Sequence, residues 1–169
     1  MEKVKLRQIS QFIFILFVFG CTNKNINSTY YKQVLGLKIN IEKNKYNFEE
    51  SAGNNEGFFL SIDSFSTKDK SILIDEKFPK LKEERKNWDI SKWSKSPFLN
   101  YENNLEVLLK YDITNDSLKS KISEFINLVK GNKSYFSYYY KKQGEAIYSI
   151  EFYLIDLDKS LLYTIIILT

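Results

Sequence analysis

Residues 146–168 read AIYSIEFYLIDLDKSLLYTIIIL, and this stretch decides the fold. Every second residue from Tyr148 to Leu154 is apolar, which is the period of a β-strand with one buried face. Residues 161–168 are apolar on both sides, which is typical of a strand covered on two faces. The polar residues 156–160 between them favour a turn. We therefore expect an antiparallel hairpin whose last strand lies inside a sheet.

Two further segments show the same signs of β-structure. Residues 134–141 carry tyrosine at each position from 138 to 140, and they predict a strand that a turn at residues 143–145 joins to the hairpin. Residues 46–65 predict a second hairpin, because alternating apolar residues flank a turn-forming stretch at 51–57.

A helix is clearest at residues 117–130, where apolar residues recur with helical spacing. The stripe consists of Leu118, Ile122, Phe125, Ile126 and Val129. Asp116 is the expected N-cap, and Gly131 follows the last turn as helix-ending glycines do. A second helix is expected at residues 68–77, after a cap at Ser66 or Thr67.

The segment between these helices is harder to assign. Residues 79–104 are polar and irregular, and Leu105–Tyr111 is interpreted as a strand because Leu105, Val107 and Leu109 alternate. Together the patterns predict an α+β fold, a mostly antiparallel β-sheet with one or two helices packed on one face. Residues 30–169 form its single globular domain, since about 150 residues suit one domain.

Two scarce residue types limit the chemistry. The 169 residues include no histidine and one cysteine. Histidine is the usual general base and the commonest metal ligand, and one thiol forms neither an intrachain disulfide nor a thiolate zinc site. We therefore expect no bound metal and no cofactor. The interpretation we favour is a non-enzyme without catalytic residues, and an enzyme that works with carboxylates alone stays open as the alternative.

The charge balance bears on partners. The net charge is +4, and residues 1–20 hold three basic residues and one acidic residue, so the remainder carries about +2. The only arginine beyond residue 20 is Arg85. It lies in a basic stretch, residues 77–86, that also contains glutamates and favours a solvated helix face. We therefore expect no nucleic-acid partner.

The N-terminus has the pattern of a secretory signal. Lys3, Lys5 and Arg7 precede the apolar run 12–19, and a basic region followed by a short apolar one is what such signals require. As a helix this run would cover about 12 Å, well short of the roughly 30 Å hydrocarbon core of a membrane. It is therefore too short for a stable membrane span.

The single cysteine follows this run directly. Val18-Phe19-Gly20-Cys21 resembles the lipobox of bacterial lipoproteins. The resemblance implies cleavage between Gly20 and Cys21, a diacylglycerol on the Cys21 sulfur and usually a third acyl chain on the new amine. Residues 1–20 would then be the signal peptide, and the lipid would attach the protein to the membrane, since two or three acyl chains anchor stably.

The segment after the cysteine is polar and rich in asparagine. We interpret residues 21–29 as the lipidated cysteine and a tether, because they lack any core-forming pattern. No acidic cluster follows Cys21, whereas in some Gram-negative groups such a cluster resembles a surface-export signal. We therefore expect attachment to the outer membrane, facing the periplasm.

Aromatic residues supply the candidate binding surface. A strand that contains three successive tyrosines must place them on both faces, and aromatic side chains are frequent anchors of protein interfaces. The candidates are Trp88, Trp93, Tyr138, Tyr139 and Tyr140.

Three functions stay open at this point. The one we favour is a lipid-anchored, non-catalytic module that binds a protein partner, with an immunity or inhibitor role as a special case. The second is a carboxylate-dependent hydrolase of envelope glycans, for which residues 49–50, 83–84 and 156/158 supply pairs of acids. The third is a structural accessory of an outer-membrane assembly.

Overall fold

The computed structural model describes residues 31, 35, 39–51, 56–67, 87–98 and 101–169, with backbone alone for residues 101–104. The proposed signal peptide, Cys21 and the tether lie outside this part of the chain, as do the helix expected at 68–77 and the basic stretch 77–86.

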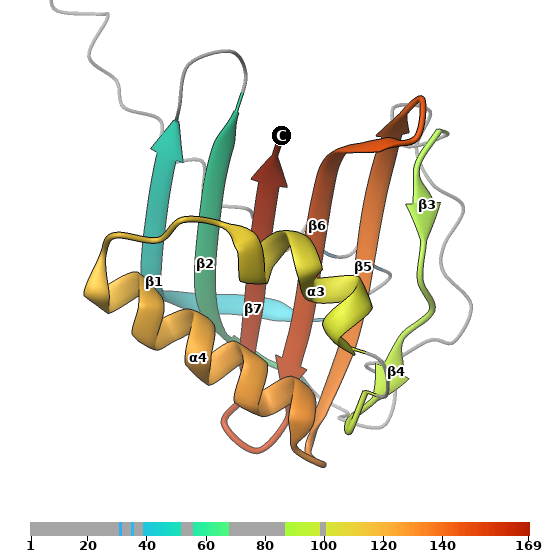
Figure 1. Cartoon of the computed structure of the whole chain (residues 1–169). Coiled ribbons are helices and arrows are strands. Elements are labelled where there is room, and N and C mark those ends of the chain that lie inside the picture. The colour runs from blue at the N-terminus through green and yellow to red at the C-terminus, as the bar shows by residue number, and fades with distance from the viewer. Residues whose placement is uncertain (1–30, 32–34, 36–38, 52–55, 68–86, 99–100) are drawn as a thin grey trace, which may run out of the picture.

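The described residues form one antiparallel sheet with helices in front of it (Figure 1). Its strands are β1 (Asn40–Ser51), β2 (Gly57–Ser66), β3 (Asp89–Ile90), β4 (Ser94–Lys95), β5 (Ser134–Gln143), β6 (Ala146–Asp156) and β7 (Leu161–Leu168). The order across the sheet is β1-β2-β7-β6-β5-β3, and β4 also pairs with β5. The predicted α+β class, mostly antiparallel sheet with helices on one face, is confirmed.

Strand β7 lies at the centre of this sheet. Ile165 pairs with Leu60 of β2 on one side and with Phe152 of β6 on the other. Because both faces of β7 are covered at its middle, Leu162–Ile165 are buried whichever way they point. The prediction that the apolar run at 161–168 is an internal strand is confirmed, and so are both hairpins.

Two helices of the described chain, α3 (Tyr101–Lys110) and α4 (Asp116–Lys130), cross the same face of the sheet (Figure 1). Helix α4 matches the expected 117–130, but its N-cap is Asn115 and not Asp116. The side chain of Asn115 accepts a hydrogen bond from the Leu118 amide at 2.9 Å. Gly131 ends the helix, and its N–H donates to the Asn127 carbonyl at 2.9 Å.

The strand expected at Leu105–Tyr111 is wrong, because these residues belong largely to helix α3. Leu105 and Leu108 are both buried, and their spacing of three places them on one side of a helix, whereas Leu109 is exposed. In the neighbouring irregular region, residues 87–98 contribute the short strands β3 and β4, which pair with β5.

Hydrophobic residues form one cluster on each face of the sheet. The first cluster lies between the sheet and the helices, and Phe125 of α4 packs there against Phe136 and Phe152 at ring-centroid distances of 6.0 and 6.5 Å. The second cluster, on the opposite face, joins Tyr31 and Trp93 to side chains of β2, β5, β6 and β7. Neither face of the sheet is therefore bare at its centre.

Candidate functional site

The aromatic candidates are divided between the two faces of the sheet. Trp93 is 6% exposed and Tyr139 1%, and both belong to the second cluster, where Tyr139 meets Tyr153 edge to face at 5.6 Å. Trp88 packs at the margin of the same cluster. A partner could touch Trp93 or Tyr139 only if the covering residues moved.

Tyr138 and Tyr140 lie on the face that carries the helices. Their rings stack 6.0 Å apart, and both pack against the first cluster. Lys142 Nζ lies 5.6 Å from the centroid of the Tyr140 ring. The five aromatic candidates therefore do not form one continuous surface, and their role in binding stays a prediction.

A recess opens instead at the end of the sheet, where the β1–β2 hairpin lies beside the C-terminal end of β7 (Figure 1). Its volume is about 370 Å³. The residues that line it are Glu49, Glu50, Ser51, Glu56, Gly57, Phe58, Phe59, Tyr148, Ile166 and Leu168. We call this site the β7-end recess.

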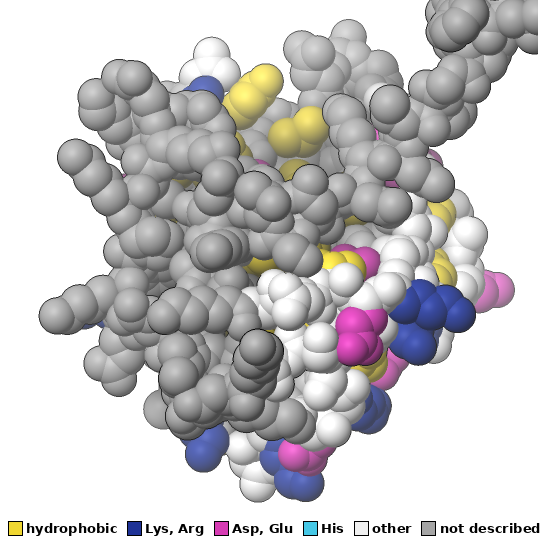
Figure 2. Space-filling view, turned by 180° about the vertical axis from the view of Figure 1, so that it is seen from behind, with side chains coloured by type: hydrophobic (Ala, Val, Ile, Leu, Met, Phe, Trp, Pro, Cys, Tyr) yellow, Lys and Arg dark blue, Asp and Glu magenta, His cyan; other side chains and the backbone are white. Residues whose placement is uncertain are grey.

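The floor of the β7-end recess is apolar. Phe59 of β2 pairs with Ile166 of β7, so their side chains lie side by side on the face opposite the helices. Tyr148 and Leu168 complete the floor and are 36% and 39% exposed. Viewed from behind, the molecule shows hydrophobic side chains gathered at this upper end (Figure 2).

The rim of the recess is acidic. Glu49, Glu50 and Glu56 are exposed, and no ion pair joins any of them to a lysine or arginine within the described ranges. Burial first, and then the carboxylates of Glu50 and Glu56, raise the pKa of Tyr111 above its ordinary value.

A buried polar network on the second face contains a carboxylate. Asp63 is 4% exposed and accepts hydrogen bonds from Asn44 at 2.8 Å, from Ser61 at 2.8 Å and from the Tyr31 hydroxyl at 3.2 Å. The Tyr31 hydroxyl also lies 3.0 Å from Thr164 Oγ1. These neutral donors satisfy the carboxylate in place of water, and Tyr31 covers it.

A second buried carboxylate, Glu151, lies on the same face and accepts from the Tyr153 hydroxyl at 2.7 Å. Neither Asp63 nor Glu151 lines the β7-end recess. Within the described ranges, no group of three or more acidic or cysteine side chains is placed to hold a metal ion.

The acid pairs that a hydrolase could use are placed as follows. Glu49 pairs with Phe59 and Glu50 with Phe58, so the two neighbouring carboxylates start from opposite faces of β1. Asp156 is buried and accepts from the amides of Asp158 and Lys159 at 3.0 and 3.1 Å, which closes the β6–β7 turn. The pair at 83–84 lies outside the described residues.

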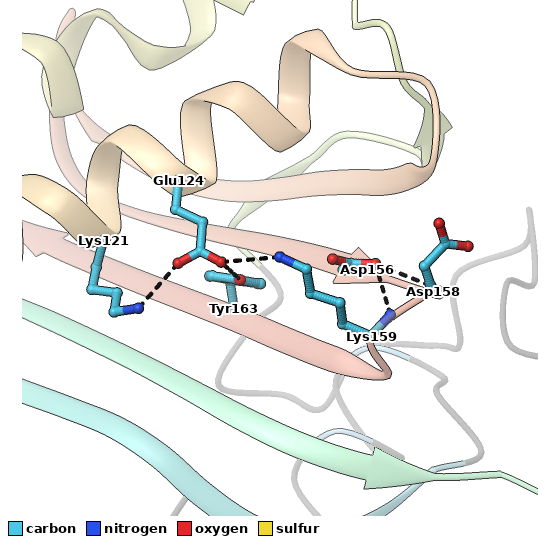
Figure 3. A network of polar contacts seen from close by, with 6 residues as sticks. All are labelled: Lys121, Glu124, Asp156, Asp158, Lys159 and Tyr163. Atoms are coloured by element: carbon cyan, nitrogen blue, oxygen red, sulfur yellow. Dashed lines mark hydrogen bonds and ion pairs between the residues drawn. The ribbon is translucent and has the colours of Figure 1, made fainter.

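A part-buried charge network sits beside this turn (Figure 3). The carboxylate of Glu124 on α4 forms ion pairs with Lys121 at 3.1 Å and with Lys159 at 3.4 Å. It also accepts a hydrogen bond from the Tyr163 hydroxyl at 2.9 Å. Desolvation acts to raise the pKa of Glu124, but the hydrogen bonds from Lys121, Tyr163 and Lys159 and the charge of Lys121 together lower that pKa. The network fixes α4 on the sheet, which is a structural role.

The β7-end recess was missed in the sequence because no local pattern marks it. Tyr148 lies near the start of β6, Leu168 ends β7, and Glu56 lies in the expected turn. The recess exists because antiparallel pairing brings the ends of β1, β2 and β7 together. The apolar residue Leu168 at the exposed end of β7 is the signal that could have located it.

Comparison with known proteins gives no further assignment. No family model, curated protein or solved structure matches this chain. None of the helices in the described part of the chain combines the length and the apolar composition needed to cross a membrane.

Proposed function

We propose that this chain is a lipid-anchored protein of the cell envelope whose folded domain binds another protein and carries out no catalysis. The proposed localisation rests on the sequence, which has a basic start, a short apolar run and the motif Val18-Phe19-Gly20-Cys21. Acyl chains on Cys21 would attach the domain to the outer membrane, facing the periplasm, with residues 22–29 as the tether.

The β7-end recess is the observation that supports a binding role. It combines exposed apolar side chains with an open, solvent-facing shape, and clustered exposed apolar residues are typical of interaction sites. Protein interfaces use such an apolar centre surrounded by a polar rim. An immunity or inhibitor protein is one form of this function, because such a protein acts by binding alone.

Photo-crosslinking in intact cells tests the binding role. Benzoylphenylalanine at position 148 replaces an exposed tyrosine on the recess floor, and the same group at Leu109 is the matched control on α3, because Leu109 is 50% exposed. We expect one discrete protein adduct from position 148 and none from position 109. Equal labelling from both positions, or no adduct from 148, would contradict the binding role.

Separation of cells into membrane and soluble fractions tests the proposed localisation independently. The native protein is expected in the membrane fraction after washing with high salt, because salt screens surface charge but does not release acyl chains. A Cys21→Ser variant is expected in the soluble fraction. If that variant stays in the membrane as the native protein does, the proposed anchor is wrong.

A further inference from the structure

We propose that the β7-end recess binds a loop of a protein partner that carries lysine or arginine side chains around an apolar residue. The inference rests on the proposed function, and it names the chemistry of the partner at the same site. It is drawn from three features: the composition of the floor, the charge of the rim, which has no ion-pair partner among the described residues, and the position of one lysine.

The floor selects an apolar side chain. Of the large hydrophobic residues that are exposed in the described part of the chain, Tyr148 and Leu168 line the recess, and Leu109 lies elsewhere on α3. The volume of about 370 Å³ is near the small end of the roughly 300–1,000 Å³ of ligand pockets. Such a space suits one or two side chains of a loop.

The rim selects positive charge. Glu49, Glu50 and Glu56 border the floor without an ion-pair partner among the described residues, so they form a local negative field. Apolar surroundings strengthen the interaction of these carboxylates with a cation that covers them. An ammonium or guanidinium placed beside an apolar side chain therefore satisfies both parts of the site.

One lysine already shows how a cation sits at this end of the sheet. Lys141 Nζ lies 5.6 Å from the centroid of the Tyr148 ring. This distance is within the range of a cation–π contact, so the ring of Tyr148 has a face that attracts an ammonium group. Against the three carboxylates of the rim, Lys141 leaves an excess of negative charge.

The same charge argues against other occupants. Anionic phospholipid and nucleic acid carry phosphates, and three glutamates at the rim repel them. A protein loop can present cationic and apolar groups within a few residues. The occupant we commit to is therefore a basic loop of a different protein.

Binding of synthetic peptides to the full-length protein, held in nonionic detergent, tests this chemistry. The probe is a fluorescent peptide with the sequence GKLKFKG, compared with GELEFEG, which reverses its charge, and GKSKSKG, which removes its apolar side chains. At low ionic strength, where screening is weak, we expect GKLKFKG to bind at least about tenfold more tightly than either comparison peptide. Fluorescence anisotropy reports the dissociation constants.

Variants of the rim locate the effect. A variant that combines Glu49→Gln, Glu50→Gln and Glu56→Gln is expected to bind GKLKFKG about tenfold more weakly, because three exposed ion pairs with the peptide are lost. The matched control combines Glu42→Gln, Asp89→Asn and Asp116→Asn, which removes the same charge from exposed positions outside the recess, and it should change binding less than about twofold. Leu168→Ser removes an apolar side chain from the floor and should also weaken the binding of GKLKFKG.

Three results would overturn the inference. The first is that GELEFEG binds as tightly as GKLKFKG, and the second is that the rim and control variants lose equal affinity for GKLKFKG. The third is that this chain forms a dimer which the rim substitutions dissociate. If any of them occurs while position 148 still crosslinks a partner in cells, the proposed binding role stands and only the basic-loop chemistry fails. If position 148 gives no adduct, the binding role itself fails.

Discussion

The hydroxyl of Tyr163, on the central strand β7, donates to Glu124 Oε1 of helix α4 at 2.9 Å. Tyr163 is fully buried, and its ring meets Phe125 at 6.3 Å in the first cluster. One side chain therefore connects the middle of the sheet, the hydrophobic core and the charged surface of the helix (Figure 3). This contact fixes the position of α4 along β7.

Removing the Tyr163 hydroxyl should destabilise the fold. Tyr163→Phe keeps the ring in the core but deletes a hydrogen bond to a charged group, which is worth about 1.5–3 kcal/mol. We expect the free energy of unfolding in urea to fall by about that amount. Tyr148→Phe is the control, because Tyr148 is exposed, and it should change stability by less than about 0.5 kcal/mol. Equal effects in the two variants would contradict the role of this bond.

The same tyrosine predicts a dependence on alkaline pH. Burial, and then the Glu124 carboxylate, raise the pKa of Tyr163 far above its ordinary value. As pH rises, the unfolded chain therefore loses this proton first, and ionisation favours unfolding above about pH 10. The stabilisation is complete below that pH and is lost as pH rises toward the folded-state pKa.

We accordingly expect the stability difference between the native protein and Tyr163→Phe to narrow above about pH 10. Other tyrosines titrate in both proteins, so their contributions cancel in this difference. The measurement is urea unfolding at several pH values between about 8 and 11. A difference that stays constant or widens over this range would show that Tyr163 is not the group responsible.

The buried carboxylate of Asp63 should be sensitive to a minimal change. Asp63→Asn replaces one of the two accepting oxygens with an amide nitrogen. In the position of Oδ1 that nitrogen faces the amide donor of Asn44, and in the position of Oδ2 it faces the hydroxyls of Ser61 and Tyr31. We expect a loss of about 1–3 kcal/mol in chemical denaturation, because a buried donor would be left without an acceptor. Asp116→Asn, at an exposed position, should cost less than about 1 kcal/mol. Similar losses in both variants would refute the buried network as the cause.

The N-cap of α4 provides a test of local structure. Asn115→Ala removes the acceptor for the Leu118 amide and should cost about 0.5–2 kcal/mol. Asn115→Asp keeps an accepting oxygen and should retain most of the stability, as measured by thermal unfolding. If Asp116→Ala proved the more costly substitution, the cap assigned from the sequence would be correct and the one in the structure would not.

Local patterns predicted most of the fold. The stripe of α4 and the alternation of β6 are repeated over enough residues to determine the element type. Helix α3 was misassigned because Leu105, Val107 and Leu109 alternate as in a strand, while Leu105 and Leu108 have helical spacing. Packing of Leu105 and Leu108 into the first cluster favours the helix, and that contact is tertiary.

The candidate site could not be predicted in the same way. Its floor depends on the register that places Phe59 beside Ile166. These two residues belong to β2 and β7, which are neighbours in the sheet but lie about 100 residues apart in the sequence. Aromatic content alone indicated Trp93 and Tyr139, yet aromatic side chains also fill cores, and both are buried here. Sequence composition does not separate these two uses of an aromatic ring.

The proposed function depends on lipid at one residue, and the mass of the mature N-terminus measures it directly. Protein extracted from membranes with detergent is digested with trypsin, and the N-terminal peptide is identified by mass spectrometry. We predict a peptide that begins at Cys21 and carries a diacylglycerol group on its sulfur. A peptide that continues upstream through Gly20, or one that begins at Cys21 with a free thiol, would contradict the account.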